Sequence, residues 1–168
     1  MKKLFLLVAM FVIAAASIAA QENKQIASIR AEVSSINKSA AKYQKKTRDV
    51  EGVSLEGTEA TYFTSGKGLK KIVAKMYGET FRATAELYYS GEEMIFAYQR
   101  MERYDTQIAA NPPPKVVKVI ETRVYYAGAN AIRVIEGKKQ LASQGAEFHG
   151  AEEAMNDLSQ KLKAAIEP

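Results

Sequence analysis

The feature that most constrains the fold is a series of strand-like segments joined by very short turns. Between residues 58 and 136, valine, isoleucine, threonine, tyrosine and phenylalanine recur with a period of two, which is typical of β-strands. Glycine-containing turns separate these segments at 65–68, 78–79, 90–93 and 127–130. Links this short join only antiparallel neighbours, because a parallel crossover needs about a dozen residues. The region therefore predicts an antiparallel β-meander.

About six strands are expected in this meander, at 58–64, 69–77, 80–89, 94–104, 116–126 and 131–136. The one long link, 105–115, contains Pro112, Pro113 and Pro114. Consecutive prolines favour an extended conformation and cannot join a central ladder. This link is predicted to be an exposed loop.

Amphipathic helices are predicted on both sides of the meander, because apolar residues recur three and four positions apart. In the N-terminal segment 23–46 these residues are Ile26, Ile29, Val33, Ile36, Ala40 and Tyr43. In the C-terminal segment they are Phe148, Ala151, Met155, Leu158, Leu162 and Ala165 or Ile166. Segregated helices and strands indicate an α+β fold. We expect both helices to pack on one face of the sheet.

The first twenty residues have the order of a cleavable signal peptide. Lys2 and Lys3 precede an apolar run that gives way to small residues up to Ala20, as in secretory leaders. A cut after Ala20 places Ala20 at the last position before the cleaved bond and Ile18 at the third position back, and both fit the narrow peptidase site. The mature protein is therefore expected to begin at Gln21. An uncleaved anchor is the alternative, but the apolar run is shorter than the roughly 20 residues of a spanning helix.

The sequence therefore divides into a signal peptide, 1–20, and a single α+β domain, 21–168. The domain has a length that suits one hydrophobic core. We expect it to be periplasmic or secreted, with no stable membrane span after cleavage.

The composition disfavours several classes of function. The chain has no cysteine and therefore no disulfides, and His149 is its only histidine. One histidine cannot supply the ligands of a zinc site, and we expect neither a metal nor a cofactor. Without the leader, 22 basic residues face 19 acidic ones, a net charge of +3. This small, scattered excess predicts no nucleic-acid partner.

A hairpin pattern recurs along the meander, in which an aromatic pair and a glycine precede an apolar strand. The segments that carry it are Gly68-Leu69-Lys70-Lys71-Ile72-Val73, Tyr77-Gly78-Glu79-Thr80, Tyr88-Tyr89-Ser90-Gly91, Met94-Ile95-Phe96-Ala97-Tyr98 and Arg123-Val124-Tyr125-Tyr126. In these segments the region 58–136 resembles a loose group of exported bacterial proteins of unknown function with Tyr-Tyr-x-Gly hairpins. It is also similar to MORN-type repeats, which use a Tyr-x-Gly unit at each hairpin. The resemblance implies β-hairpins and brings no activity or cofactor.

Candidate binding residues are aromatic and basic side chains of the predicted strands. Successive strand residues point to opposite faces, so one ring of each Tyr-Tyr pair should face the core and the other should face outward. Tyrosine and arginine are both enriched in interface hot spots. The candidate binding surface comprises Tyr88, Tyr89, Tyr98, Tyr125, Tyr126, Arg100 and Arg123. The alternative is that the rings only pack on one another and cover the sheet.

Catalytic chemistry has fewer candidates. His149 lies near no Gly-x-Ser-x-Gly elbow of a serine hydrolase. Glu79, Glu86, Glu102 and Glu121 lie on or beside strands and could form a catalytic pair, although nearby arginines favour ion pairs. We therefore expect a non-enzymatic binding or inhibitory module whose partner is an envelope protein or polymer. The alternatives are a carboxylate-dependent hydrolase of envelope polymers and a small-ligand carrier.

Overall fold

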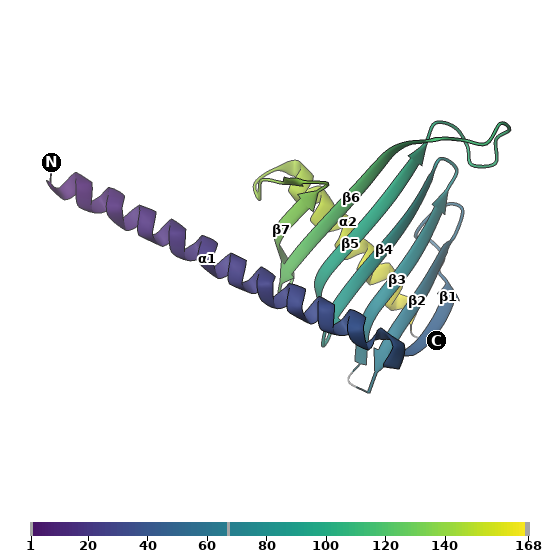
Figure 1. Cartoon of the computed structure of the whole chain (residues 1–168), viewed down its shortest axis with the longest axis horizontal. Coiled ribbons are helices and arrows are strands. Elements are labelled where there is room, and N and C mark those ends of the chain that lie inside the picture. Colours follow the sequence, from purple (N-terminus) through teal and green to yellow (C-terminus); the bar gives the residue numbers. More distant parts are fainter. Residues whose placement is uncertain (1, 67, 167–168) are drawn as a thin grey trace.

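The computed structural model describes residues 2–66 and 68–166, and for residues 2–19 the backbone alone. Two helices flank one antiparallel sheet in which every strand pairs with the next one in the sequence (Figure 1). The predicted α+β meander is confirmed, but it has eight strands and not six. The elements are α1 (Lys2–Ser39), the 3-10 turn η1 (Ala40–Lys42), β1 (Gln44–Asp49), β2 (Thr58–Ser65), β3 (Gly68–Gly78), β4 (Phe81–Ser90), β5 (Glu93–Tyr104), β6 (Val116–Ala127), β7 (Asn130–Glu136), β8 (Lys139–Gln140) and α2 (Ala146–Ala164).

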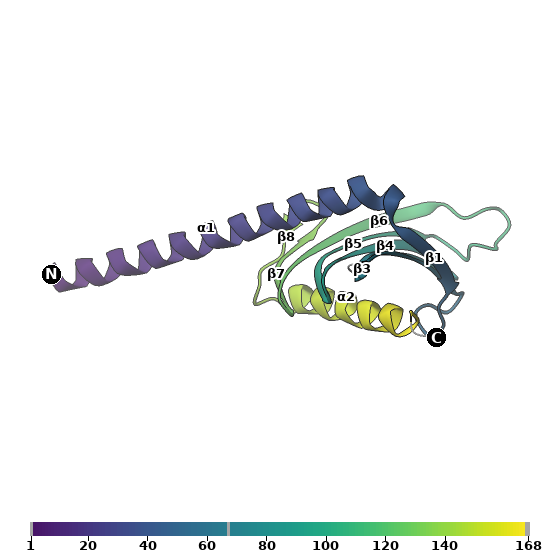
Figure 2. The ribbon, with the colours of Figure 1, turned by 90° about the horizontal axis from the view of Figure 1, so that it is seen from below.

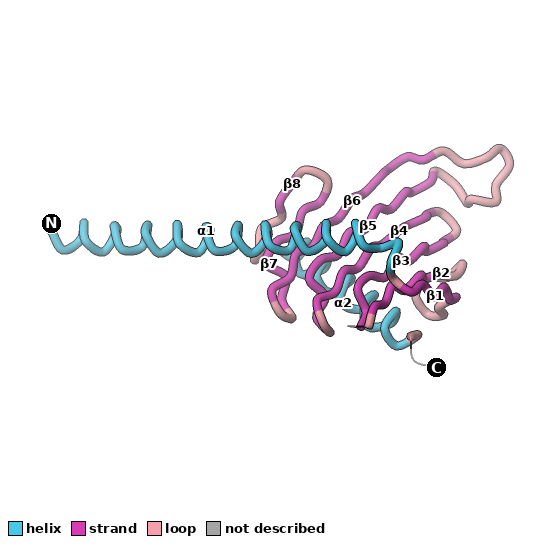
Figure 3. Tube along the Cα trace, turned by 60° about the horizontal axis from the view of Figure 1, so that its bottom comes forward, coloured by secondary structure: helices cyan, strands magenta, loops and turns pink. Residues whose placement is uncertain are grey.

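Met1 of the predicted leader and Lys67 of the first predicted turn lie outside the described residues. The predicted exposed loop 105–115 joins β5 to β6 and projects past the ends of the neighbouring strands (Figure 3). It is mostly exposed to solvent, including Pro112 and Pro113.

The first strand, β1, begins within the predicted N-terminal helix, and the two overlap at residues 44–46. The backbone becomes extended at Tyr43, with φ −81° and ψ 148°, and β1 then pairs with β2 along its whole length. The Thr47 and Thr61 hydroxyls lie 2.9 Å apart across this pair. The predicted helix to residue 46 is wrong because pairing with the edge of the sheet outweighs local helix propensity.

Three hairpins bend the sheet in the same way. The register shifts at the end of β2, between Phe63 and Thr64, and at the ends of β4 and β6, within the Tyr88-Tyr89 and Tyr125-Tyr126 pairs. Such irregularities are β-bulges, which bend a strand and increase its twist. The aromatic pairs noted in the sequence therefore coincide with the points where the sheet curves.

Each face of the curved sheet is covered by a different helix. Figure 2 shows α2 inside the curve, against what we call the concave face, and α1 across the outer, convex face. The Tyr89 hydroxyl contacts Ser159 of α2 at 2.8 Å, whereas the Tyr88 hydroxyl lies 3.1 Å from Asn37 Oδ1 of α1. The expectation that both helices share one face is wrong, because both faces of the meander carry apolar side chains.

The main hydrophobic core lies between the concave face and α2. The α2 side chains Phe148, Met155, Leu158 and Leu162 are buried there against strand residues. A smaller core joins α1 to the convex face, where Ile26 and Ile29 pack around Tyr125. The N-terminal part of α1 extends beyond the sheet (Figure 1).

Candidate functional site

An aromatic row on the convex face forms the floor of the candidate site. Tyr88 of β4, Phe96 of β5 and Tyr125 of β6 are direct cross-strand partners. The ring centroids of Tyr88 and Phe96 are separated by 5.7 Å, and those of Phe96 and Tyr125 by 4.8 Å. Tilted aromatic pairs at these separations stabilise a sheet beyond the area that they bury. The row is therefore a rigid surface on which another element can rest.

The C-terminal part of α1 forms a wall beside this row. Arg30 places its guanidinium carbon 5.6 Å from the Tyr125 ring centroid, and its Nε donates to the Tyr125 hydroxyl at 3.4 Å. Val33, one turn further along α1, packs against the smaller core. The helix is therefore anchored over one end of the aromatic row.

A groove of about 510 Å³ lies between the wall and the row, open to solvent. Its volume is in the range of small-molecule sites. Most of its lining surface is apolar. The lining residues are Arg30, Val33, Ser34, Asn37, Lys38, Phe96 and Tyr125.

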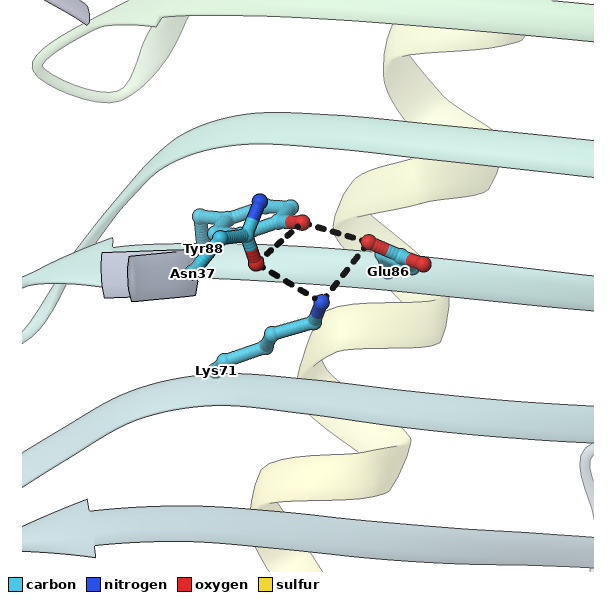
Figure 4. A network of polar contacts seen from close by, with 4 residues as sticks. All are labelled: Asn37, Lys71, Glu86 and Tyr88. Atoms are coloured by element: carbon cyan, nitrogen blue, oxygen red, sulfur yellow. Dashed lines mark hydrogen bonds and ion pairs between the residues drawn. The ribbon is translucent and has the colours of Figure 1, made fainter. Parts of the chain in front are cut away.

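A polar network of four residues meets the groove at Asn37 (Figure 4). Lys71 of β3 donates from Nζ to Glu86 Oε2 at 2.8 Å and to Asn37 Oδ1 at 3.0 Å. The Tyr88 hydroxyl donates to Glu86 Oε2 and lies 3.1 Å from Asn37 Oδ1. Lys71 is only 8% exposed, so its charge depends on these partners. The network ties α1 to β3 and β4.

The network also holds its charged groups in their ionised forms. Burial by itself lowers the pKa of Lys71, but hydrogen bonds to Glu86 and Tyr88 outweigh it and leave the pKa raised. Burial by itself raises the pKa of Glu86, yet hydrogen bonds from Lys71 and Tyr88 leave it lowered. Burial raises the pKa of Tyr88, and the neighbouring Glu86 raises it further. The pair is therefore a fixed ion pair at neutral pH.

Four of the predicted binding residues are buried. Tyr88, Tyr89, Tyr125 and Tyr126 are 2%, 1%, 4% and 3% exposed. The rings do alternate between the two faces, but the outward-facing ones, Tyr88 and Tyr125, lie under α1. The expectation that they form an exposed aromatic surface is wrong, because the convex face has a helix of its own. Tyr89 and Tyr126 belong to the concave core.

The other three predicted binding residues remain on the open part of the convex face. Arg123 lies with its guanidinium carbon 5.3 Å from the Tyr98 ring centroid. Glu121 accepts hydrogen bonds from both of them, at 2.8 Å from Arg123 and at 3.0 Å from Tyr98. Arg100 pairs with Glu102 on the same strand. The seven predicted residues thus fall into separate groups, and the arginine charges are matched by carboxylates.

Three of the four carboxylates considered for catalysis, Glu86, Glu102 and Glu121, lie beside cations. The Arg100 and Tyr104 hydrogen bonds lower the pKa of Glu102, and those of Arg123 and Tyr98 lower the pKa of Glu121. A glycosidase-type general acid needs a raised pKa, so this environment disfavours that role for both residues. Glu79 accepts a hydrogen bond from Gln107 at the opposite end of the sheet.

Sequence reasoning missed most of the residues that make the groove, although Tyr125 was among the predicted binding residues. Arg30, Asn37 and Lys38 lie on α1 beside the apolar stripe, and Phe96 and Lys71 lie on strands. One signal was present: Arg30, Ser34, Asn37 and Lys38 recur at helical spacing, which predicts a polar strip along one side of the helix. Nothing in the sequence indicated that this strip faces Phe96.

Comparisons with protein-family models, curated proteins and solved structures find no match for this chain. The resemblance to exported Tyr-Tyr-x-Gly proteins therefore stays a prediction. Among the described residues, no helix is long and apolar enough to cross a membrane, and no cluster of three or more His, Asp or Glu side chains could hold a metal ion.

Proposed function

We propose that this chain is an exported, non-enzymatic binding protein that takes a small molecule into the groove between α1 and the aromatic row. The observation that carries the proposal is the groove itself. It is largely apolar and open to solvent, and it has a rigid aromatic floor and a helical wall that is held by ion pairs and hydrogen bonds. Preformed concave sites of this size with a few polar groups are typical of ligand-binding proteins.

Export is supported by the leader pattern, and contacts that anchor α1 lie beyond the predicted cut. Arg133 of β7 donates to Glu22 at 2.8 Å and to Asn23 at 2.9 Å. Both partners follow the predicted cut after Ala20, so a mature chain that begins at Gln21 retains them. The groove wall is also retained, since it starts at Arg30.

The experiment compares two tryptophan variants by native mass spectrometry of protein purified from the exporting cell. Ser34→Trp fills the groove, whereas Ser35→Trp adds the same bulk at an exposed neighbouring position outside it. We expect the wild type and Ser35→Trp to retain a bound small molecule and Ser34→Trp to lose it. A retained ligand in Ser34→Trp would contradict the proposed site, as would bare polypeptide in all three proteins.

A second candidate function is recognition of an envelope protein or polymer by the open convex face. It is favoured by Tyr98, whose ring lies under Arg123 and is only partly covered, since tyrosine and arginine often anchor interfaces. Affinity capture with Tyr98→Ala tests it. Loss of a captured partner, with unchanged thermal stability, is the expected result for this function.

A further inference from the structure

We infer that the ligand of the groove is a monomeric amphiphile with an anionic head, such as a carboxylate or phosphate, and an apolar tail. This inference rests on the proposed function and specifies the chemistry that the same site recognises. The head would lie against Arg30, Asn37 and Lys38, and the tail would lie along Phe96 and Tyr125.

The side chain of Asn37 turns its amide nitrogen away from the network. Its Oδ1 accepts from Lys71 Nζ at 3.0 Å and lies 3.1 Å from the Tyr88 hydroxyl. An ammonium group can only donate, so the amide oxygen must face Lys71 and the amide nitrogen must face away. That nitrogen has no hydrogen-bond partner among the described residues. Asn37, an exposed residue that lines the groove, therefore presents two N–H donors left unpaired by the described residues.

The charged groups that line the groove have the same sign. Arg30 uses Nε for the Tyr125 hydroxyl, and its two terminal nitrogens have no partner in the described part of the chain. Lys38 has none there either, and the lining contains no carboxylate. Two cations and an amide donor around one opening favour an anion, and charge-assisted hydrogen bonds are the stronger kind. An unpaired cationic ligand would meet repulsion instead.

The floor of the groove indicates what the anion carries. Phe96 and Tyr125 present aromatic carbon, and Val33 adds an aliphatic wall. A free inorganic anion would leave this surface in water, whereas an alkyl or aryl tail would cover it and gain stabilisation with each buried methylene. The combination of donors at the rim and apolar carbon on the floor matches an amphiphile.

Calorimetric titration with named probes tests the inference on the purified protein. The probes are decanoate, octanoate and decyltrimethylammonium, all kept monomeric. We expect decanoate to bind at least tenfold more tightly than decyltrimethylammonium. Removal of two methylenes, in octanoate, should weaken binding by about fivefold to fifteenfold. Equal affinity for the two head groups would overturn the anion preference.

Two variants remove the proposed head-group contacts. Lys38→Gln should weaken decanoate binding by about tenfold, whereas Lys24→Gln, at an exposed α1 position outside the groove, should leave it within about twofold. Asn37→Asp keeps an oxygen for Lys71 but replaces the free donors with a negative oxygen. It should retain the thermal stability of the wild type and lose decanoate binding. Wild-type affinity in Lys38→Gln and Asn37→Asp would contradict the assigned head-group site.

The controls separate this inference from the proposed function. If both decanoate and decyltrimethylammonium bind equally and Ser34→Trp abolishes both, the groove binds ligands but the anion preference is wrong. If no amphiphile binds and the exported protein carries no ligand, both proposals fail. Binding to phosphatidylglycerol vesicles without binding to monomeric decanoate would show that the cations recognise a membrane surface, which overturns the inference.

Discussion

Lys71 Nζ lies 2.8 Å from Glu86 Oε2, across the β3–β4 pair and at the edge of α1. Lys71 is almost fully buried, and about a third of the Glu86 side chain is exposed. Glu86→Gln would leave the buried ammonium without its counter-charge. We expect the free energy of unfolding to fall by about 2 kcal/mol. This loss is smaller than the roughly 3–5 kcal/mol that follows when one partner of a fully buried ion pair is removed. Urea unfolding at pH 7 measures it. Glu59→Gln, which breaks the exposed pair with Lys75, should cost less than about 1 kcal/mol.

The same pair predicts how stability depends on pH. The pKa of Glu86 is lowered in the folded protein, so its contribution is complete above the ordinary carboxyl pKa and is lost as the pH falls through the lowered value. The pKa of Lys71 is raised, so its contribution persists through neutral pH. The difference between wild type and Glu86→Gln should therefore be constant from about pH 7 to 5 and shrink below about pH 4. A difference that grows on acidification would contradict the ion pair.

Two tyrosines on the concave face should respond oppositely to loss of the hydroxyl. Tyr126 has a buried hydroxyl with no partner among the described residues, whereas the Tyr89 hydroxyl contacts Ser159 Oγ at 2.8 Å. Tyr126→Phe removes an unsatisfied polar group and should leave the free energy of unfolding unchanged or raise it by up to about 1 kcal/mol. Tyr89→Phe leaves Ser159 unpaired and should lower it by about 1 kcal/mol. Equal losses in the two variants would show that the Tyr126 hydroxyl has a partner in solution.

The two helices should differ in how much of the fold depends on them. Leu158 of α2 lies in the main core and Ile29 of α1 in the smaller one. Leu158→Asp buries an unpaired charge between sheet and helix and should cost about 4 kcal/mol or more. Ile29→Asp should lower the free energy of unfolding by about 2 kcal/mol, because α1 can detach from the sheet while the main core remains. Thermal unfolding gives the comparison. A variant that melts at the wild-type temperature would show that the substituted helix face is not part of a core.

The exported protein should begin at Gln21. The leader has the three-part order of a signal peptide, and Ile18 and Ala20 occupy the expected positions before the cut. Intact-mass measurement of the exported form determines the first residue. A mass that includes Met1 to Ala20 would show that the leader is retained as part of α1.

The central hairpins were predictable because their signals are local. A glycine turn and alternating residues define β4 and β5 within a few positions, and the meander order follows from the short links. β1 was not predictable in this way, since all six residues of Gln44–Asp49 are polar or charged and the strand exists through pairing with β2. The two-residue β8 has too few positions to show a period.

The candidate site was less predictable than the fold. Alternation correctly placed Tyr88 and Tyr89 on opposite faces, but which face receives which helix depends on the direction in which the sheet curves. The groove joins residues that are distant in sequence, such as Asn37 and Lys71, 34 positions apart. Helical spacing marks the polar strip on α1, yet its partner Phe96 looks like any other strand residue until the chain is folded.

The attachment of α1 has a consequence for the order in which the chain folds. Arg30 bonds to Tyr125, 95 residues away, and Glu22 to Arg133, 111 residues away. These two contacts of α1 therefore cannot form until β6 and β7 have been synthesised. Until then Ile26 and Ile29 have no Tyr125 ring to pack on. This part of the fold thus depends on contacts between distant residues, which form more slowly than local ones.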